Sequence, residues 1–129
     1  SPFDCIDRLL PDMDTPNILV DFHAEATSEK KVMGYYLDGR VSAVIGTHTH
    51  VQTADATVLR GGTAYLTDVG MTGAVYSVLG ADVGCATKKV VTNLPVRLNT
   101  AGGEMQLNAA VIDLDEKTGK ALAIETIVL

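Results

Sequence analysis

The sequence predicts an α/β domain in which a parallel βαβ unit is followed by β-hairpins. Two nearly continuous apolar runs, 17–22 and 41–46, are typical of strands buried on both faces, and they flank a stretch with helical spacing. A strand–helix–strand order over about 30 residues is typical of a right-handed crossover, so the two strands should be parallel. Turn signals and partly alternating segments follow, which favour hairpins.

Local signals define the two helices at the start of the chain. Ser1 can serve as an N-cap, and Pro2 suits the first position of a helix. Between the two strands, Thr27 or Ser28 can cap the second helix, and Asp38-Gly39 ends it.

The remainder of the chain is expected to be rich in strands. The expected elements are a hairpin of 58–59 and 64–67 around Gly61-Gly62, a glycine-punctuated loop at 68–73, a helix at 82–93, a strand at 95–99, and a final hairpin of 106–114 and 121–129. No repeat, linker or low-complexity segment divides the chain. Residues 1–129 therefore form a single domain or one half of a domain.

Composition limits the kinds of partner. The formal net charge of −6 argues against a broad basic surface for DNA, but a small phosphorylated ligand is compatible because a bound metal ion supplies local positive charge. No run approaches the roughly 20 apolar residues of a membrane span. The first residues lack signal-peptide features, so a cytoplasmic protein is expected. Cys5 and Cys85 match no disulfide or metal spacing and are expected to be free thiols, with zinc ligation as the weaker alternative.

The chemistry of the chain is concentrated in its three histidines. His23 follows the first strand, and the His-x-His pair of His48 and His50 follows the second. Parallel strands end at one edge of a sheet, where open α/β sheets bind ligands, so the three rings should converge. Alternation along an extended backbone would also point both rings of the pair to one side. Because imidazole is a common ligand of transition metals, the sequence predicts a metal site formed by these histidines.

Some neighbouring polar residues are further candidates for the site. Asp68 follows an apolar strand and is either a ligand, a support for the ligands or a turn-capping aspartate. Glu25 and Lys30 come shortly after His23; a solvated helix start is the favoured explanation of both, and a functional role is the alternative. Thr49 is a further candidate for contacting substrate or supporting the ligands.

Longer strings around the histidines resemble those of a known family. GTHTH, at 46–50, resembles the GHTH signature of calcineurin-like metallophosphoesterases. DFHAEATSEK at 21–30, GTHTHVQT at 46–53 and TDVGMTG at 67–73 together resemble the YmdB-like branch, bacterial phosphodiesterases that act on cyclic nucleotides. The similarity extends over nearly the whole chain and is densest from 17 to 80.

The resemblance implies a four-layer αββα sandwich with two divalent metal ions, commonly iron or manganese, with zinc as a further option. By motif position, His23 and His48 would serve one metal and His50 the other. The implied substrates are 2′,3′-cyclic nucleotides and, as a wider option, 3′,5′-cyclic ones. Two-metal sites stabilise both the attacking and the leaving oxygen of an in-line displacement.

The family pattern also has an N-terminal half that this sequence does not match. That half begins with a Gly-Asp strand and supplies Asp, Glu and Asn ligands, together with an Asn-His pair whose histidine assists as the catalytic acid. The chain thus resembles the C-terminal half of a metallophosphoesterase domain. We expect the isolated chain to bind at most one divalent metal weakly, to turn over little substrate, and to expose apolar surface that favours a homo-oligomer or pairing with the missing half.

The main hypothesis is therefore the histidine-bearing part of a metal-dependent cyclic-nucleotide phosphodiesterase. The first alternative is a non-catalytic metal-binding or interaction module that retains the same half-site. The second is another metal-dependent hydrolase, such as an amidohydrolase, which also uses His-x-His. In amidohydrolases that pair lies on the first strand with many βα units after it, whereas a hairpin-rich tail follows here.

Overall fold

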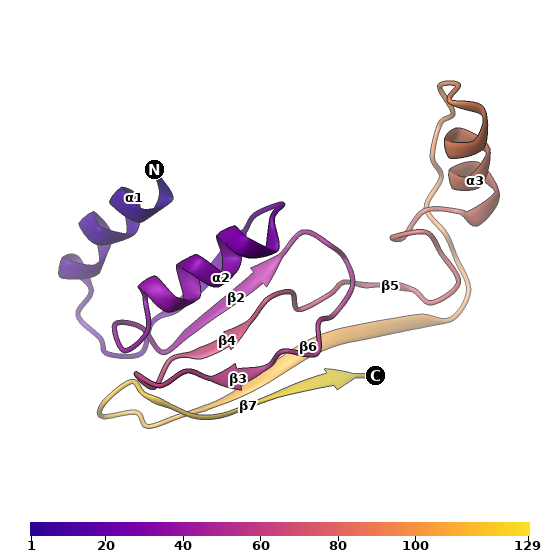
Figure 1. The fold of residues 1–129 in the computed structure, drawn as a ribbon. Helices are drawn as coiled ribbons and strands as arrows, with labels where there is room; N and C mark the ends of the chain where they lie inside the picture. Colours follow the sequence, from indigo (N-terminus) through magenta and orange to yellow (C-terminus); the bar gives the residue numbers. More distant parts are fainter.

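The N-terminal part of the chain forms the predicted βαβ unit in a computed structural model that describes residues 1–129. Strand β1 (Leu19–His23) and strand β2 (Ala43–Thr47) pair in parallel. Helix α2 (Thr27–Tyr36) connects them and lies over one face of the sheet (Figure 1). The parallel βαβ unit is therefore confirmed.

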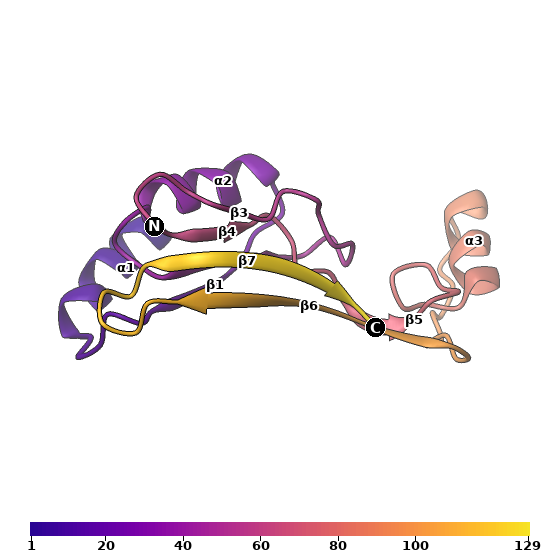
Figure 2. The same cartoon turned by 90° about the horizontal axis from the view of Figure 1, so that it is seen from below.

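Two sheets make up the fold. The first has the strand order β1-β2-β4-β3, in which β4 (Ala64–Leu66) is parallel to β2 and β3 (Thr57–Val58) is antiparallel to β4. The second has the order β5-β6-β7 and is antiparallel; its strands are Thr72–Ala74, Met105–Leu114 and Ala121–Val128. The β6–β7 hairpin lies on the face of the first sheet opposite α2 (Figure 2). The predicted mixed α/β class, with hairpins after the parallel unit, is confirmed.

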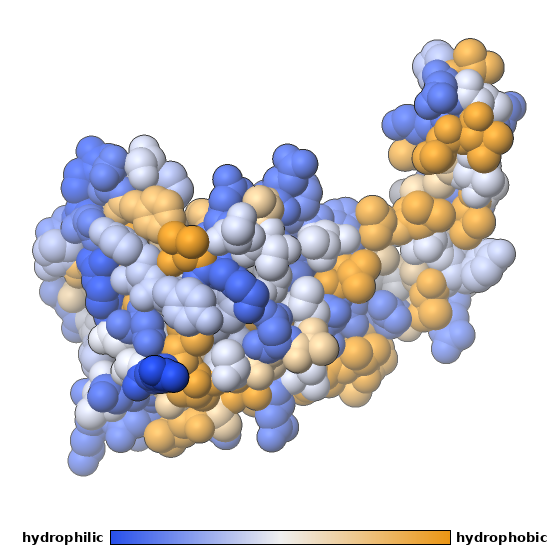
Figure 3. Space-filling view, viewed as in Figure 1, coloured by the Kyte–Doolittle hydropathy of each residue, from blue (hydrophilic) through white to orange (hydrophobic).

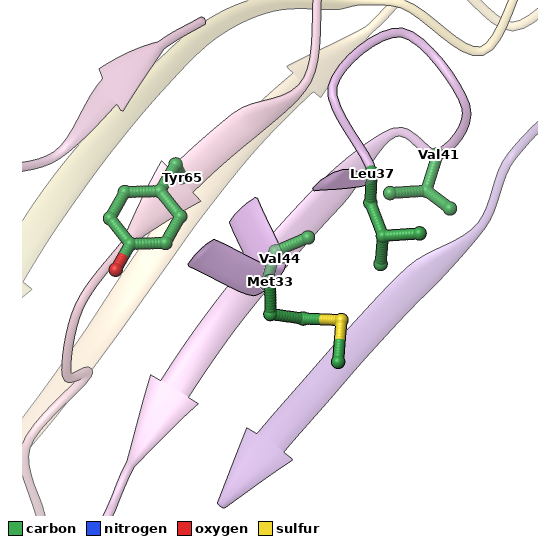
Figure 4. Close-up of a cluster of buried hydrophobic side chains, with 5 residues drawn as sticks. All are labelled: Met33, Leu37, Val41, Val44 and Tyr65. Atoms are coloured by element: carbon green, nitrogen blue, oxygen red, sulfur yellow. The ribbon is translucent and has the colours of Figure 1, made fainter. Parts of the chain in front are cut away.

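Apolar side chains fill the space between α2 and the first sheet and the space between the two sheets. The core under α2 consists of buried residues from the helix, from the connection that follows it and from strands β2 and β4, namely Met33, Leu37, Val41, Val44 and Tyr65 (Figure 4). The core between the two sheets is built on Ala43, Ala64 and Ala121, with Ile112 and Ile124 packed against it. Small alanine side chains let the hairpin approach the first sheet closely.

Two further helices complete the fold, one packed against the core under α2 and one projecting from the molecule. Helix α1 (Pro2–Leu9) begins as predicted, because the Ser1 hydroxyl accepts a hydrogen bond from the Phe3 N–H at 3.3 Å; a short 3-10 turn, Leu10–Asp12, follows it. Helix α3 (Val83–Thr92) stands away from the rest of the molecule at the end of two extended segments (Figure 1).

Both cysteines are free: Cys5 is exposed, and Cys85, in α3, is half-buried. None of the helices has the length and apolar character needed to cross a membrane.

Three expectations about these elements were wrong. The first strand is not buried on both faces, because β1 is an edge strand and its side chains alternate; Leu19 is 63% exposed. Residues 95–99 form no strand, because the segment returning from α3 has no strand beside it and makes only a single bridge, from Thr100 to Ala81. Helix α2 is capped neither by Thr27 nor by Ser28, which lie inside it.

The start of α2 is closed in another way. Its N-cap is Ala26, whose methyl side chain can accept no hydrogen bond. Instead the carboxylate of Glu29 reaches back and accepts the Ala26 N–H at 3.3 Å. The sequence signal for the start of α2 was therefore Glu29, the third residue of the helix, and not Thr27 or Ser28.

Candidate metal-binding site

The structure places two of the three histidines in contact at the carboxyl edge of the first sheet. His23 is the last residue of β1 and pairs in register with Thr47, the last residue of β2. His48 follows immediately, and its Nδ1 lies 3.2 Å from His23 Nε2, with the two rings edge to face at 79°. Parallel pairing therefore brings together imidazole nitrogens that are 25 residues apart in sequence.

A hydrogen bond orients the His23 ring. Its Nδ1 lies 3.1 Å from the Thr47 hydroxyl oxygen. A ring protonated at Nδ1 donates to Thr47 and leaves a free lone pair on Nε2, the atom that faces His48. Ligation of a metal by histidine characteristically relies on such a partner at the other ring nitrogen.

The His-x-His segment is a turn and not an extended strand. Strand β2 ends at Thr47, and φ is +130° at His48 and +63° at His50. Residues other than glycine rarely adopt such backbone angles. Strained backbone of this kind clusters at functional sites. The expectation that strand alternation points both rings to one side was therefore wrong, because the chain leaves the strand before the pair begins.

The third histidine faces a different neighbour. His50 Nδ1 lies 3.4 Å from the Leu79 carbonyl oxygen, in the loop before α3. No group of three or more His, Cys, Asp or Glu side chains in this chain is placed to hold a metal ion. The metal role assigned to His23, His48 and His50 thus remains a prediction, with two of the three rings in contact.

The Asp68 carboxylate is hydrogen-bonded to the backbone of residues 48–50, which we call the histidine turn. Asp68 is completely buried; its Oδ2 accepts the Thr49 N–H at 2.7 Å, and its Oδ1 accepts the Gly70 N–H at 2.9 Å. Burial by itself raises the pKa of Asp68. These N–H donors and the Lys30 ammonium lower the pKa by more than burial raises it, so the pKa lies below the usual 3.8. Asp68 is thus a buried anion that contacts the turn through the backbone of Thr49.

Two further residues contact this turn: Lys30, which was a candidate from the sequence, and Gln52, which was not identified from it. Lys30 is fully buried, not solvated at a helix start: its Nζ lies 3.2 Å from both Asp68 Oδ2 and the Thr47 carbonyl oxygen. Gln52 ties the turn to the second sheet, since its Nε2 donates to the carbonyls of Val69, Ala109 and Ile127 at 3.0–3.4 Å. No spacing rule marks such contacts.

The other candidates lie on the surface or in the backbone network. Glu25 is exposed and makes no side-chain hydrogen bond or ion pair. Thr49 is half-buried, and its hydroxyl donates to the Val51 carbonyl at 3.0 Å. Thr49 therefore contributes to the shape of the turn through both its hydroxyl and its backbone.

The side chains present fit one side of a metal centre. Two imidazole nitrogens that share an ion at about 2.0–2.1 Å, at ligand angles of about 90–110°, lie about 2.8–3.4 Å apart. The observed separation of His23 Nε2 and His48 Nδ1, 3.2 Å, falls in this range. The Asp68 carboxylate, which would be an anionic ligand, is occupied by its N–H and ammonium donors. The pair of nitrogens has the spacing of two ligands of one ion, and no third ligating side chain lies with them.

Comparison with known proteins connects this geometry to a family. The profile of a family described as YmdB-like protein matches residues 1–127. A Bacillus subtilis (strain 168) protein named 2′,3′-cyclic-nucleotide 2′-phosphodiesterase is 57% identical over 115 residues, which cover 89% of this chain and 44% of that protein. A Mycoplasma pneumoniae protein named as a putative phosphatase/phosphodiesterase is 36% identical over 128 residues, 98% of this chain and 46% of that protein.

Solved structures show the same arrangement of elements. The crystal structure of a protein from Thermus thermophilus, described as hypothetical, superimposes on the whole chain with a TM-score of 0.94 at 44% identity, and the match covers 50% of that protein. A structure described as a novel phosphatase from Mycoplasma pneumoniae also gives a TM-score of 0.94, at 35% identity and 46% coverage. The chain spans about half the length of the curated relatives that it matches.

Proposed function

The chain belongs to the YmdB-like protein family, and from this premise we propose that it supplies the histidine ligands of a metal-dependent phosphodiesterase. The observation that carries the proposal is the contact between His23 and His48, on strained backbone, at the edge where two parallel strands end. Open α/β sheets bind their ligands at this edge. The names of the relatives support a phosphodiester substrate.

We propose that His23 and His48 bind one divalent ion and that His50 binds a second. Iron or manganese is the expected metal, and zinc is the alternative. When bound, a pair of divalent ions stabilises the charge that develops on a phosphodiester during in-line displacement. The chain's own part is to fix two nitrogen donors 3.2 Å apart and to orient the His23 ring through Thr47.

The substrate class follows from the relative with the highest identity reported above. We propose that the whole protein hydrolyses 2′,3′-cyclic nucleotides, with 3′,5′-cyclic nucleotides as a wider substrate range. The carboxylate ligands and the catalytic acid are expected from the other half of the protein, because Asp68 is enclosed and the three histidines are assigned to metals.

The edges of both sheets support completion by another chain segment. No strand pairs with the outer edge of β1, and none pairs with the β5 side of β6 beyond Leu107. An apolar groove of about 230 Å³ lies beside these edges; among its lining residues are Leu19, Ile45, Val69 and Ile112. We propose that the part of the protein corresponding to the unmatched half of its relatives pairs here and closes the metal site.

The test is Mn²⁺ binding by the full-length protein, measured by calorimetry, followed by hydrolysis of 2′,3′-cyclic AMP. We expect His23→Ala and His48→Ala to lose the same equivalent of metal, so that the double variant loses no more than either single one. His50→Ala should lose a different equivalent, and all three should lower turnover by a factor of 100 or more. Lys117→Ala, in the exposed β6–β7 loop, is the control.

The outcome separates the two functional hypotheses. Metal bound through the histidines with no turnover of any phosphodiester would favour the non-catalytic metal-binding module. Unchanged metal binding in the histidine variants would defeat both.

A further inference from the structure

We infer that the buried ion pair of Lys30 and Asp68 is a positioning device that holds the histidine turn in its metal-binding shape. The inference rests on the proposed function, since it assigns a purpose to the geometry of His48. Both side chains are essentially buried, with 1% and 0% of their surface exposed, and Lys30 Nζ lies 3.2 Å from Asp68 Oδ2. Burying two charges carries a large desolvation cost, so this pair is weak evidence for stability alone. The other contacts of the two side chains indicate what the pair contributes to the site.

Each partner also contacts the backbone on one side of His48. Lys30 Nζ donates to the Thr47 carbonyl at 3.2 Å, and Asp68 Oδ2 accepts the Thr49 N–H at 2.7 Å. The ion pair thus fixes the peptide groups before and after a residue whose φ is +130°. A residue held at such an angle needs surrounding contacts that over-determine its conformation.

The pair is itself anchored to other elements. Lys30 belongs to α2, and the Asp68 backbone is held by Thr53, whose hydroxyl accepts the Asp68 N–H at 2.9 Å and whose own N–H donates to the Asp68 carbonyl at 3.0 Å. The Lys30 side chain passes over Gly46, where a Cβ would lie 2.7 Å from Lys30 Cδ. Helix, strand and loop therefore converge on the turn through this one ion pair.

Two apolar side chains could fill the space of Lys30 and Asp68, but they could not form the same hydrogen bonds. Apolar residues of similar volume often stabilise a fold as well as a buried ion pair does. Only an acceptor with two free oxygens can receive the N–H groups of both Thr49 and Gly70 together with an ammonium. A positioning role and a purely structural role therefore predict different results for a double substitution.

The experiment uses the full-length protein and four variants: Asp68→Asn, Lys30→Met, the double variant Lys30→Met/Asp68→Leu, and the control Lys31→Met. The control removes the neighbouring lysine of the same helix, whose 3.4 Å ion pair with Asp55 is partly exposed. The readouts are the urea unfolding midpoint, the Kd for Mn²⁺, and the visible absorption spectrum with Co²⁺ alone, which reports ligand geometry.

We expect Asp68→Asn and Lys30→Met to be less stable than the wild type and to bind Mn²⁺ at least tenfold more weakly. The double variant should be more stable than Lys30→Met, which leaves a buried carboxylate without its cation, yet remain tenfold weaker in Mn²⁺ binding, with an altered Co²⁺ spectrum. Lys31→Met should match the wild type in Mn²⁺ binding and in the Co²⁺ spectrum. Recovery of both stability and Mn²⁺ affinity in the double variant would overturn the inference. So would wild-type affinity in Asp68→Asn.

Hydrogen exchange on the unsubstituted protein provides a test that needs no variant to fold. The Thr49 amide should exchange at least 100-fold more slowly than the amide of exposed His50, which donates no hydrogen bond, and equal rates would overturn the inference. Failure of the unsubstituted protein to bind Mn²⁺ would defeat the proposed function. Binding of Mn²⁺ by the Lys30 and Asp68 variants with wild-type affinity would defeat the positioning role and leave the proposed function standing.

Discussion

Gly46 shows how closely the backbone packs beside the histidine turn. A Cβ atom at this position would lie 1.8 Å from the carbonyl oxygen of Thr67. The Gly46 carbonyl also accepts the Val69 N–H at 2.9 Å, so strand β2 and the segment that follows β4 cannot separate easily. The absence of a side chain allows this approach, which in turn brings Asp68 under Thr49.

The substitution Gly46→Ala should therefore destabilise the chain by about 3 kcal/mol, because the added methyl group must displace backbone. Urea unfolding measures the difference. Gly102→Ala is the matched control, since a Cβ there meets nothing within 4 Å and should change the unfolding free energy by less than about 0.5 kcal/mol. Equal effects of the two substitutions would contradict this account of the packing.

At the scale of elements, Asp55 joins α2 to the loop before β3 and to the end of β4. Its carboxylate accepts hydrogen bonds from the hydroxyls of Thr53 and Thr67 and from the Thr67 N–H, and it pairs with Lys31 at 3.4 Å. Partial burial raises the pKa of Asp55, but these donors outweigh it and hold the pKa below 3.8. The carboxylate is thus more acidic in the folded chain than in the unfolded one.

This difference predicts how stability depends on pH. Because the folded-state pKa is depressed, the contribution of Asp55 is fully present above about pH 4 and is lost as the pH falls through the folded-state value. The stability difference between the wild type and Asp55→Asn should be constant from pH 7 to 5 and shrink at lower pH. Urea unfolding at each pH tests this, with Asp14→Asn, an exposed site without a partner, as the control. A difference that does not change with pH would exclude the Asp55 explanation.

At the scale of the whole molecule, the chain exposes apolar surface in two separate places. One is the open edge of β1 beside the groove, where Leu19 is 63% exposed. The other is the projecting segment around α3, where Val90 and Val91 are 74% and 75% exposed and apolar side chains gather on the visible face (Figure 3). Exposed strand edges and apolar patches favour association.

We therefore expect the chain on its own to form oligomers whose size rises with concentration, as measured by light scattering after gel filtration. Leu19→Lys should shift the distribution toward monomer, because a lysine protects an open strand edge. Val90→Lys on α3 is the comparison. If only the α3 variant gave monomers, the contact would lie on the projecting helix, and a monomer at every concentration would contradict the expectation.

The sequence by itself determined the elements whose signals are local. Ser1 and Pro2 predicted the start of α1, and Gly61-Gly62 predicted the β3–β4 hairpin. The two apolar runs around a helix predicted a βαβ unit with parallel strands. The meeting of His23 and His48 followed, because the carboxyl ends of parallel strands lie at one edge of a sheet. The family resemblance rested on the same strings and is confirmed by the profile match.

Only the tertiary structure decided which side chains are buried and where the rings point. Lys30 has the sequence context of an exposed helix residue, yet it is enclosed because Gly46 leaves space for it and Asp68 neutralises it. His50 faces Leu79 and not the other two rings, because the backbone turns after Thr47. Burial, turn geometry and the open edge of β1 depend on neighbours that are distant along the chain, and periodicity carries no information about them.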